Sequence, residues 1–429
     1  GRSVHVEVRG LQPAREYFYI FFAGSQSSPV GRAVTAPGFS DKPSRIKAVF
    51  ASCAHWERGY FAAYRHMAQE QPDLVFFLGD YIYEYSATGD RAKDNVRTHD
   101  RAADIVDLAG YRNRYALYKT DPDLQALHRV APCHMIWDDH EVQNDYAGAW
   151  SQDVEPTEAQ FAERRRAAYQ AFYENMPLRR RSIPAMDGAV RIYDRYKWGD
   201  LAQFTLLDER QYRSIQPCPR TDASGKVTSR RGHAAPLSCP DLSDQTRTML
   251  GAEQEAWLTQ GFSQISAKWN IIPQQLFVAN ALQPIEPKDP ESPLGYYTDG
   301  WSGFEPARQR MVDALEASGV KNTVFFGGDL HAYLTSNINT KAGKTVAAEF
   351  VGSSITSDPG AESLIRSMKA NPHILLVDNS VRGYISADIT PARIDVRYRA
   401  ISDRRVRDAT VATHQSYVVE DNKPGVQTA

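Results

Sequence analysis

The sequence has few cysteines, no long apolar run and no excess of one charge. Its 429 residues include 50 Lys and Arg against 52 Asp and Glu, which gives a formal net charge of −2. This balance creates no global basic field, so nucleic acid is not indicated as a main partner. No run of about 18 apolar residues occurs, so no transmembrane segment is predicted. The chain also starts without a signal peptide, because its first residues already resemble a strand, and we expect any targeting sequence to have lain upstream.

The four cysteines, at positions 53, 133, 218 and 239, form no close pair of the zinc-binding type. Cys218 and Cys239 each adjoin a proline in a polar stretch rich in Gly, Ser, Thr and Arg, which is typical of a loop. A disulfide between them would place the protein outside the cytoplasm, and two free thiols are the alternative. Cys133 lies in the apolar run APCHMIW and is predicted to be a small core residue.

With 42% hydrophobic and 24% charged residues, the chain can bury a large core, as one large domain with an appendage or as two domains. Residues 1 to 37 alternate like strands, in VHVEV, YFYIFFA and VGRAV. The segment Leu11-x-Pro13-x-x-x-Tyr17 resembles the tyrosine corner of immunoglobulin-like and fibronectin-like sandwiches. About three strands are too few for a complete sandwich, so we predict a partial all-β domain over residues 1–40 and one main domain over residues 41–429.

From Arg45 onward, strands alternate with helices, which predicts an α/β (α+β) fold. The predicted strands include RIKAVFASC, DLVFFLGD, HMIWDDHE, LAQFTLLDERQ, WNIIPQQ and NTVFFGGDLH, followed near the C-terminus by AAEFVG, GYISADIT and RIDVRYRAI. The predicted helices include FAAYRHMAQEQ, EAQFAERRRAAYQAFYENM and GAEQEAWLTQGFSQ. Ligands of open α/β sheets bind at the carboxyl ends of the strands, so the residues that follow each strand are the ones to inspect.

Four of these apolar strands end in potential metal ligands: Cys53, Asp80 with Tyr83, Asp138-Asp139-His140 with Asn144, and Asp329 with His331. In the stretch FFLGDYIYEY, Asp80 could merely cap a turn while the tyrosines fill the core. However, buried carboxylates without partners are costly, and several of them at one sheet edge require nearby cations. The pattern therefore predicts a metal site.

The order of these motifs resembles that of the metallophosphoesterases. The corresponding segments are Ser52-Cys53, Gly79-Asp80-x-x-Tyr83, Asp138-Asp139-His140-Glu141 and Gly328-Asp329-Leu330-His331. Together with RRRAAYQAFYENMPLR, LLDERQYRS and EFVGSSITSD, they resemble the alkaline phosphatase D (PhoD-type) family, which includes phosphodiesterases and phospholipases D. The resemblance covers the whole chain and implies a metallophosphoesterase-like β-sandwich flanked by helices, with a small N-terminal fibronectin-like segment.

The resemblance implies one ferric ion and two calcium ions. Asp80 would bridge two cations, Tyr83 would bind iron as tyrosinate, and Cys53 would bind it as thiolate, with a buried inert thiol as the alternative. Asp139 would replace the asparagine of the third motif, and His140 would act beside the phosphate as an acid or a charge stabiliser.

Three further ligands are implied in the same way. Asn144 would bind calcium, with an Asx-turn as the alternative. Asp329 and His331 would close the site, with hydrogen bonding to a ligand as the alternative for His331. Other metallophosphoesterases supply a histidine from a middle strand, where this chain has Gln274 and Gln275, whose amides suit calcium.

Arg166 and Arg210 are candidates for holding a phosphate oxygen, and ordinary salt bridges are the alternative for both.

The expected function is hydrolysis of phosphate esters at alkaline pH by in-line attack of hydroxide formed on the cations, with phosphomonoesterase and phosphodiesterase activity. The alternatives are a phospholipase-D-like enzyme acting on lipid or polymer phosphodiesters, and a non-catalytic binding protein stabilised by metals. The family also implies export of the folded precursor by the Tat machinery, to a periplasmic or secreted location.

Overall fold

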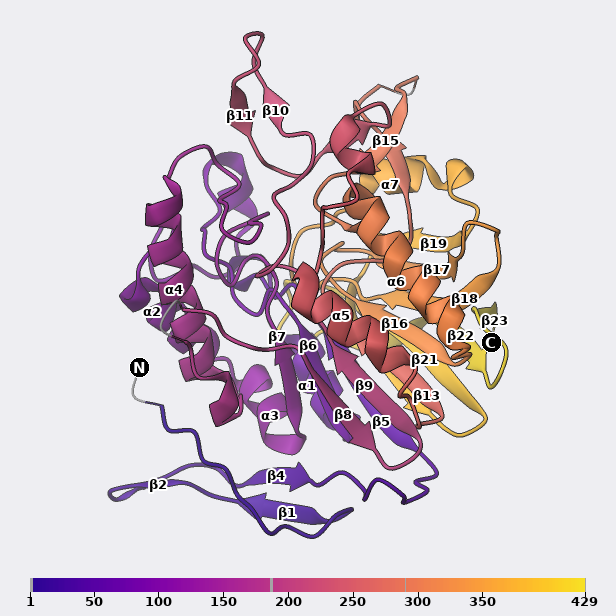
Figure 1. The fold of residues 1–429 in the computed structure, drawn as a ribbon. Helices are drawn as coiled ribbons and strands as arrows, with labels where there is room; N and C mark the ends of the chain where they lie inside the picture. The colour runs from indigo at the N-terminus through magenta and orange to yellow at the C-terminus, as the bar shows by residue number, and fades with distance from the viewer. Residues whose placement is uncertain (1–2, 186–187, 290, 429) are drawn as a thin grey trace.

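Two seven-stranded sheets face each other in the computed structural model, which describes residues 3–185, 188–289 and 291–428 (Figure 1). Aromatic side chains fill the space between the sheets. Phe50 stacks on Phe326 of the opposite sheet with ring centroids 4.1 Å apart, and Phe76 lies 5.0 Å from Phe204. These side chains come from strands whose residues are almost all buried, which explains why the sequence shows continuous apolar runs there.

The first sheet contains the strands that precede three of the four ligand motifs. Its order is β23 (Gln427–Thr428), β22 (Val411–Glu420), β21 (Arg393–Ile401), β20 (Arg382–Ile389), β5 (Ile46–Ala51), β6 (Leu74–Leu78) and β7 (Cys133–Ile136). Strands β5, β6 and β7 are parallel, so their carboxyl ends lie at one edge. Cys133, the first residue of β7, is half-buried.

The second sheet contains the strand that precedes the fourth motif. Its order is β19 (Ile374–Asp378), β17 (Tyr333–Asn339), β18 (Thr345–Val351), β16 (Thr323–Gly327), β13 (Trp269–Pro273), β9 (Ala202–Leu206) and β8 (Asp194–Trp198). Strands β9, β13, β16 and β18 are parallel to one another.

Helices flank both sheets, as predicted (Figure 1). One group consists of α1 (Ala62–Gln69), α2 (Leu108–Tyr118), α3 (Pro122–Val130) and α4 (Glu158–Asn175). The other consists of α5 (Gly251–Phe262), α6 (Glu305–Ser318) and the short α7 (Glu362–Arg366). Helix α4 begins with a capping box, in which Thr157 and Gln160 satisfy each other's backbone N–H groups. None of the described helices combines the length and apolarity that membrane crossing requires.

Smaller elements complete the chain. A hairpin of β10 (Arg220–Thr221) and β11 (Val227–Ser229) projects from the upper end in Figure 1, beside a sheet of β12 (Ala234–Pro236), β15 (Leu294–Tyr297) and β14 (Leu282–Pro284). Short 3-10 helices occur at Trp56–Arg58, Gly89–Asp94, Arg180–Ser182, Pro240–Ser243, Trp301–Phe304 and Met368–Ala370.

The N-terminal segment is all-β and lies at the opposite end from this hairpin (Figure 1). Strand β1 (Glu16–Tyr19) pairs with β4 (Gly31–Val34), and β2 (Phe22–Ala23) pairs with β3 (Gln26–Ser27). The Tyr17 hydroxyl accepts a hydrogen bond from the Gln12 N–H at 2.8 Å, which confirms the predicted tyrosine corner.

The strand predicted for VHVEV does not form. Residues 4–8 are not paired with a strand, and Val4 is 82% exposed. Instead, His5 stacks on Tyr173 of α4 at 4.3 Å and contacts the Leu178 carbonyl oxygen at 2.8 Å. Alternation alone cannot create a strand without a neighbouring strand to accept its hydrogen bonds.

Candidate metal centre

The carboxyl ends of β5, β6, β7 and β16 bring the predicted ligands together at one edge of the sandwich. Four of these ligands have left-handed backbone conformations: φ is 60° at Cys53, 51° at Asp80, 59° at Asp329 and 56° at His331. Residues other than glycine avoid this region, at a cost of roughly 1–3 kcal/mol each. Such a concentration of strained residues at strand ends indicates a site that the fold holds in place for a function.

The first ligand group is built around Tyr83. One ligand atom from each of Cys53, Asp80 and His331 lies within 4.8 Å of the others. The Tyr83 hydroxyl joins them, 2.8 Å from Asp80 Oδ2 and 3.1 Å from His331 Nε2. The structure thus places Cys53 and Tyr83, the two residues expected to bind iron, beside Asp80 and His331.

Burial controls the charges of this group. It raises the pKa of the Cys53 thiol and of the Tyr83 phenol well above their usual values, and the neighbouring Asp80 adds to both shifts. Burial also lowers the pKa of His331 to about 3, so that this imidazole is neutral, the form that binds metals. Deprotonated Cys53 and Tyr83 therefore require a cation beside them.

Two further groups share the aspartates. Asp80, Asp139 and His140 form one, and Asp138, Asp139 and Asp329 form the other, each with ligand atoms within 4.8 Å. Three buried carboxylate oxygens, Asp80 Oδ1, Asp138 Oδ2 and Asp139 Oδ1, have no hydrogen-bond partner among the residues that the structure describes. Buried polar atoms are rarely left unpaired, so these oxygens fit the hard cations that the resemblance implies. Asp138 was among the potential ligands named at the strand ends, but the family resemblance implied no ligand role for it.

His140 is held by a residue that the sequence did not single out. Its Nδ1 lies 2.7 Å from Glu84 Oε2, and the other Glu84 oxygen accepts a hydrogen bond from the Asn144 N–H at 2.8 Å. Burial opposes a charge on His140, but Glu84 and Asp139 outweigh it and hold the pKa of His140 well above its usual value. Glu84 lies between Tyr83 and Tyr85 in FFLGDYIYEY. A carboxylate in such an aromatic segment is the feature of the sequence that could have indicated a role for Glu84.

A cavity of about 310 Å³ opens onto the ligands. Its wall includes Asp80, Asp139, His140, Asn144, Asp329 and His331, together with Phe277, Leu330 and Tyr297. Asn144 donates through Nδ2 to Gln152 at 2.8 Å, which leaves its Oδ1 as the atom for a cation. Cys53 and Tyr83 do not line this cavity and are both buried.

The two arginines predicted to hold phosphate do not line the cavity. Arg166 is exposed on α4. Arg210 is fully buried and makes ion pairs with Asp138 and Asp299, the latter at 2.7 Å. The ion pairs of Arg210 agree with the alternative that it forms ordinary salt bridges.

Other buried polar residues support the ligands from behind. Glu141 accepts hydrogen bonds from the backbone N–H groups of Asp80, Tyr81 and Asp138, and so joins the ends of β6 and β7. Gln275 donates to the Trp137 and Leu207 carbonyl oxygens, whereas both side-chain polar atoms of Gln274 lack a hydrogen-bond partner within the described part of the chain. Gln274 and Gln275 do not line the cavity.

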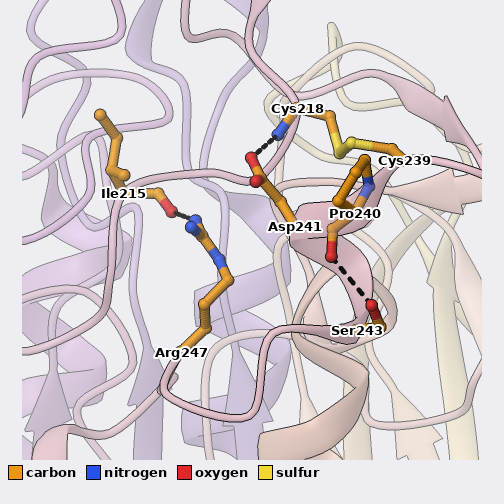
Figure 2. Close-up of a disulfide and its surroundings, with 7 residues drawn as sticks. All are labelled: Ile215, Cys218, Cys239, Pro240, Asp241, Ser243 and Arg247. Carbon is orange, nitrogen blue, oxygen red and sulfur yellow. Dashed lines mark hydrogen bonds between the residues drawn. A yellow bond between two sulfur atoms is a disulfide. The ribbon is translucent and has the colours of Figure 1, made fainter.

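A disulfide joins Cys218 to Cys239 at the base of the projecting hairpin, as predicted (Figure 2). The Cys218 N–H donates to Asp241 at 2.9 Å beside it. The loop closed by this bond reaches the cavity wall, because the Gly232 N–H donates to Asp145 Oδ2 at 2.9 Å.

Comparisons with known proteins agree along the whole chain. A family model described as PhoD-like phosphatase matches residues 48–398, and a second, described as its N-terminal domain, matches residues 1–37. Alkaline phosphatase D of Bacillus subtilis (strain 168) is 38% identical over 439 aligned positions, which cover 99% of this chain and 71% of that protein. A solved structure, "Structure of PhoD", matches with a TM-score of 0.86 at 37% identity and covers 99% of this chain and 79% of that one.

Proposed function

The chain belongs to the PhoD-like phosphatase family and is a phosphoesterase, and we propose that it hydrolyses phosphomonoesters at alkaline pH and also accepts diesters. The observation that carries the proposal is the convergence of three ligand groups on one cavity, with buried carboxylate oxygens left unpaired. A purely structural metal site would not need an open cavity beside its ligands.

We assign a ferric ion to Cys53, Asp80, Tyr83 and His331, and two calcium ions to the carboxylates. Thiolate and phenolate oxygen are strong donors that suit a ferric ion. Asp139, Asp329 and Asn144 offer hard oxygen atoms, which calcium prefers. When bound, these cations supply positive charge to phosphate oxygens and lower the pKa of an attacking water.

The protein's own groups orient the ester and stabilise its charge. His140 lies in the cavity wall and is kept cationic by Glu84, so its ring can donate a hydrogen bond to a phosphate oxygen or to the leaving oxygen. Because Nδ1 is engaged by Glu84, Nε2 is the atom that faces the substrate. In-line displacement would place the attacking water and the leaving oxygen on opposite sides of phosphorus.

The apolar part of the cavity supports the acceptance of diesters. Phe277, Leu330 and Tyr297 line the wall beyond the ligand groups, where an organic substituent of the phosphate can pack. A phosphodiesterase that acts on lipid or polymer diesters remains the second candidate on this observation.

We propose a periplasmic or secreted location, with export of the folded precursor by the Tat machinery. The disulfide supports an oxidising compartment, because disulfides persist outside the cytoplasm. Export after folding would allow the metals to be loaded before the chain crosses the membrane.

The test compares hydrolysis of p-nitrophenyl phosphate and bis-p-nitrophenyl phosphate at alkaline pH with calcium present. We expect activity on both, with the monoester preferred, and loss of activity after chelation that added calcium restores. A preference for the diester would assign the second candidate function. No activity on either substrate, in protein that carries its metals, would overturn the proposal.

A further inference from the structure

The loop after β18 holds the residues of the first ligand group from behind. It belongs to EFVGSSITSD, one of the stretches that carry the resemblance to the alkaline phosphatase D family. The Ile355 N–H donates to the Ser52 carbonyl oxygen at 3.0 Å, and the Thr356 and Ser357 N–H groups both approach the Cys53 carbonyl oxygen. These bonds help to hold Cys53 in its left-handed conformation.

Within this loop, Ser357 contacts Tyr83 directly. Its hydroxyl oxygen lies 2.7 Å from the Tyr83 hydroxyl oxygen and 2.9 Å from the Cys53 carbonyl oxygen. Ser357 is 1% exposed and does not line the cavity, so it touches neither solvent nor substrate. A hydroxyl has one proton, so Ser357 can donate to only one of these two oxygens at a time.

The Cys53 carbonyl oxygen already accepts from the Thr356 and Ser357 N–H groups, so the Tyr83 oxygen is the acceptor that depends on the Ser357 hydroxyl. A neutral Tyr83 donates its own proton to Asp80 Oδ2 at 2.8 Å. A deprotonated Tyr83 can only accept, and Asp80, itself an acceptor, no longer bonds to it. His331 Nε2 lies 3.1 Å away, but it is assigned as a metal ligand. Among the described contacts of this oxygen, Ser357 is then the hydrogen-bond donor that remains.

We propose that Ser357 is a positioning residue that donates a hydrogen bond to the Tyr83 phenolate and thereby sets its donor strength toward the iron. This inference rests on the proposed iron assignment and deepens it. A hydrogen bond draws electron density away from a phenolate oxygen. Its loss makes Tyr83 a stronger donor, which stabilises the ferric over the ferrous ion.

The test uses the visible charge-transfer band of a tyrosinate bound to ferric iron, which is independent of turnover. Tyr83→Phe identifies the part of the absorption that belongs to Tyr83. Ser357→Ala should move that band to longer wavelength, because the phenolate electrons rise in energy. Ser357→Thr keeps the hydroxyl and should leave the band near its wild-type position.

Ser354→Ala is the matched control. Ser354 is also fully buried in the same loop, and its hydroxyl donates to the Ser357 carbonyl oxygen at 2.9 Å, with no described contact to Tyr83. This variant should keep the wild-type band. Ser357→Cys, which is close to serine in size and donates weakly, should shift the band in the same direction as Ser357→Ala and serves if the alanine variant does not fold.

A second measurement is the one-electron reduction potential of the iron, obtained by titration with dithionite. We expect Ser357→Ala to be about tenfold harder to reduce, which corresponds to about 59 mV for one electron. An unchanged band and potential in both Ser357→Ala and Ser357→Cys would overturn the role of Ser357 while leaving the iron assignment intact. A wild-type protein that hydrolyses esters but shows no Tyr83-dependent band would overturn both the iron assignment and this inference.

Discussion

Replacement of Arg210 by methionine is expected to destabilise the protein strongly. The Arg210 guanidinium is fully buried, bonded to Asp138 and Asp299, and its Nη2 lies 3.8 Å from Asp139 and 3.7 Å from Asp329. Methionine fills much of the same space but leaves these carboxylates without their central cation.

The size of the effect follows from the burial of the ion pairs. Removing one partner of a buried pair costs about 3–5 kcal/mol, because the remaining charge stays buried and uncompensated. The free energy of unfolding of a typical protein is about 5–15 kcal/mol, so this loss is a large share of it. Calcium bound to the same carboxylates would replace part of the missing charge, so added calcium should stabilise Arg210→Met more than it stabilises the wild type.

The assay is urea unfolding followed by tryptophan fluorescence, in chelator and in calcium. Arg166→Met is the matched control, because Arg166 is exposed on α4 and its loss should change stability by no more than about 0.5 kcal/mol. Equal stabilities of the Arg210 and Arg166 variants in chelator would refute the view that Arg210 holds the acidic cluster together.

Three other changes have expected outcomes. Glu84→Gln should lower kcat/KM for p-nitrophenyl phosphate by about 10–100-fold, because His140 loses a charge-assisted hydrogen bond worth about 1.5–3 kcal/mol; a loss of less than twofold would exclude this role. Cys239→Ser should reduce the free energy of unfolding by about 3 kcal/mol, since the bond closes a loop with a sequence separation of 21; unfolding with and without reductant checks this, and an unchanged wild type in reductant would contradict it. Burial lowers the pKa of His128 to about 3 and of His134 to about 4, so the unfolded chain takes up their protons first as the pH falls below about 6.5. Stability should therefore fall by up to about 1.4 kcal/mol per pH unit for each histidine between pH 6 and pH 4, and equal urea midpoints at pH 7 and pH 5 would refute this.

Local patterns in the sequence are enough to predict where the strands end and which candidate ligands follow them. Apolar runs that stop at Gly79-Asp80 or Gly328-Asp329 are local features, and parallel strands bring their carboxyl ends to one edge in any such sheet. The tyrosine corner at Tyr17 was also predictable, because its hydrogen bond spans only five residues.

The surroundings of these candidate ligands could not be predicted, because they depend on how distant segments pack. Glu84 meets His140 across 56 residues and Ser357 meets Tyr83 across 274, and no local pattern encodes such separations. Arg210 reads in the sequence as a residue that could face phosphate, but folding buries it among aspartates from other segments. A side chain's partner and its access to solvent depend on which segments pack around it, and that is a property of the whole fold.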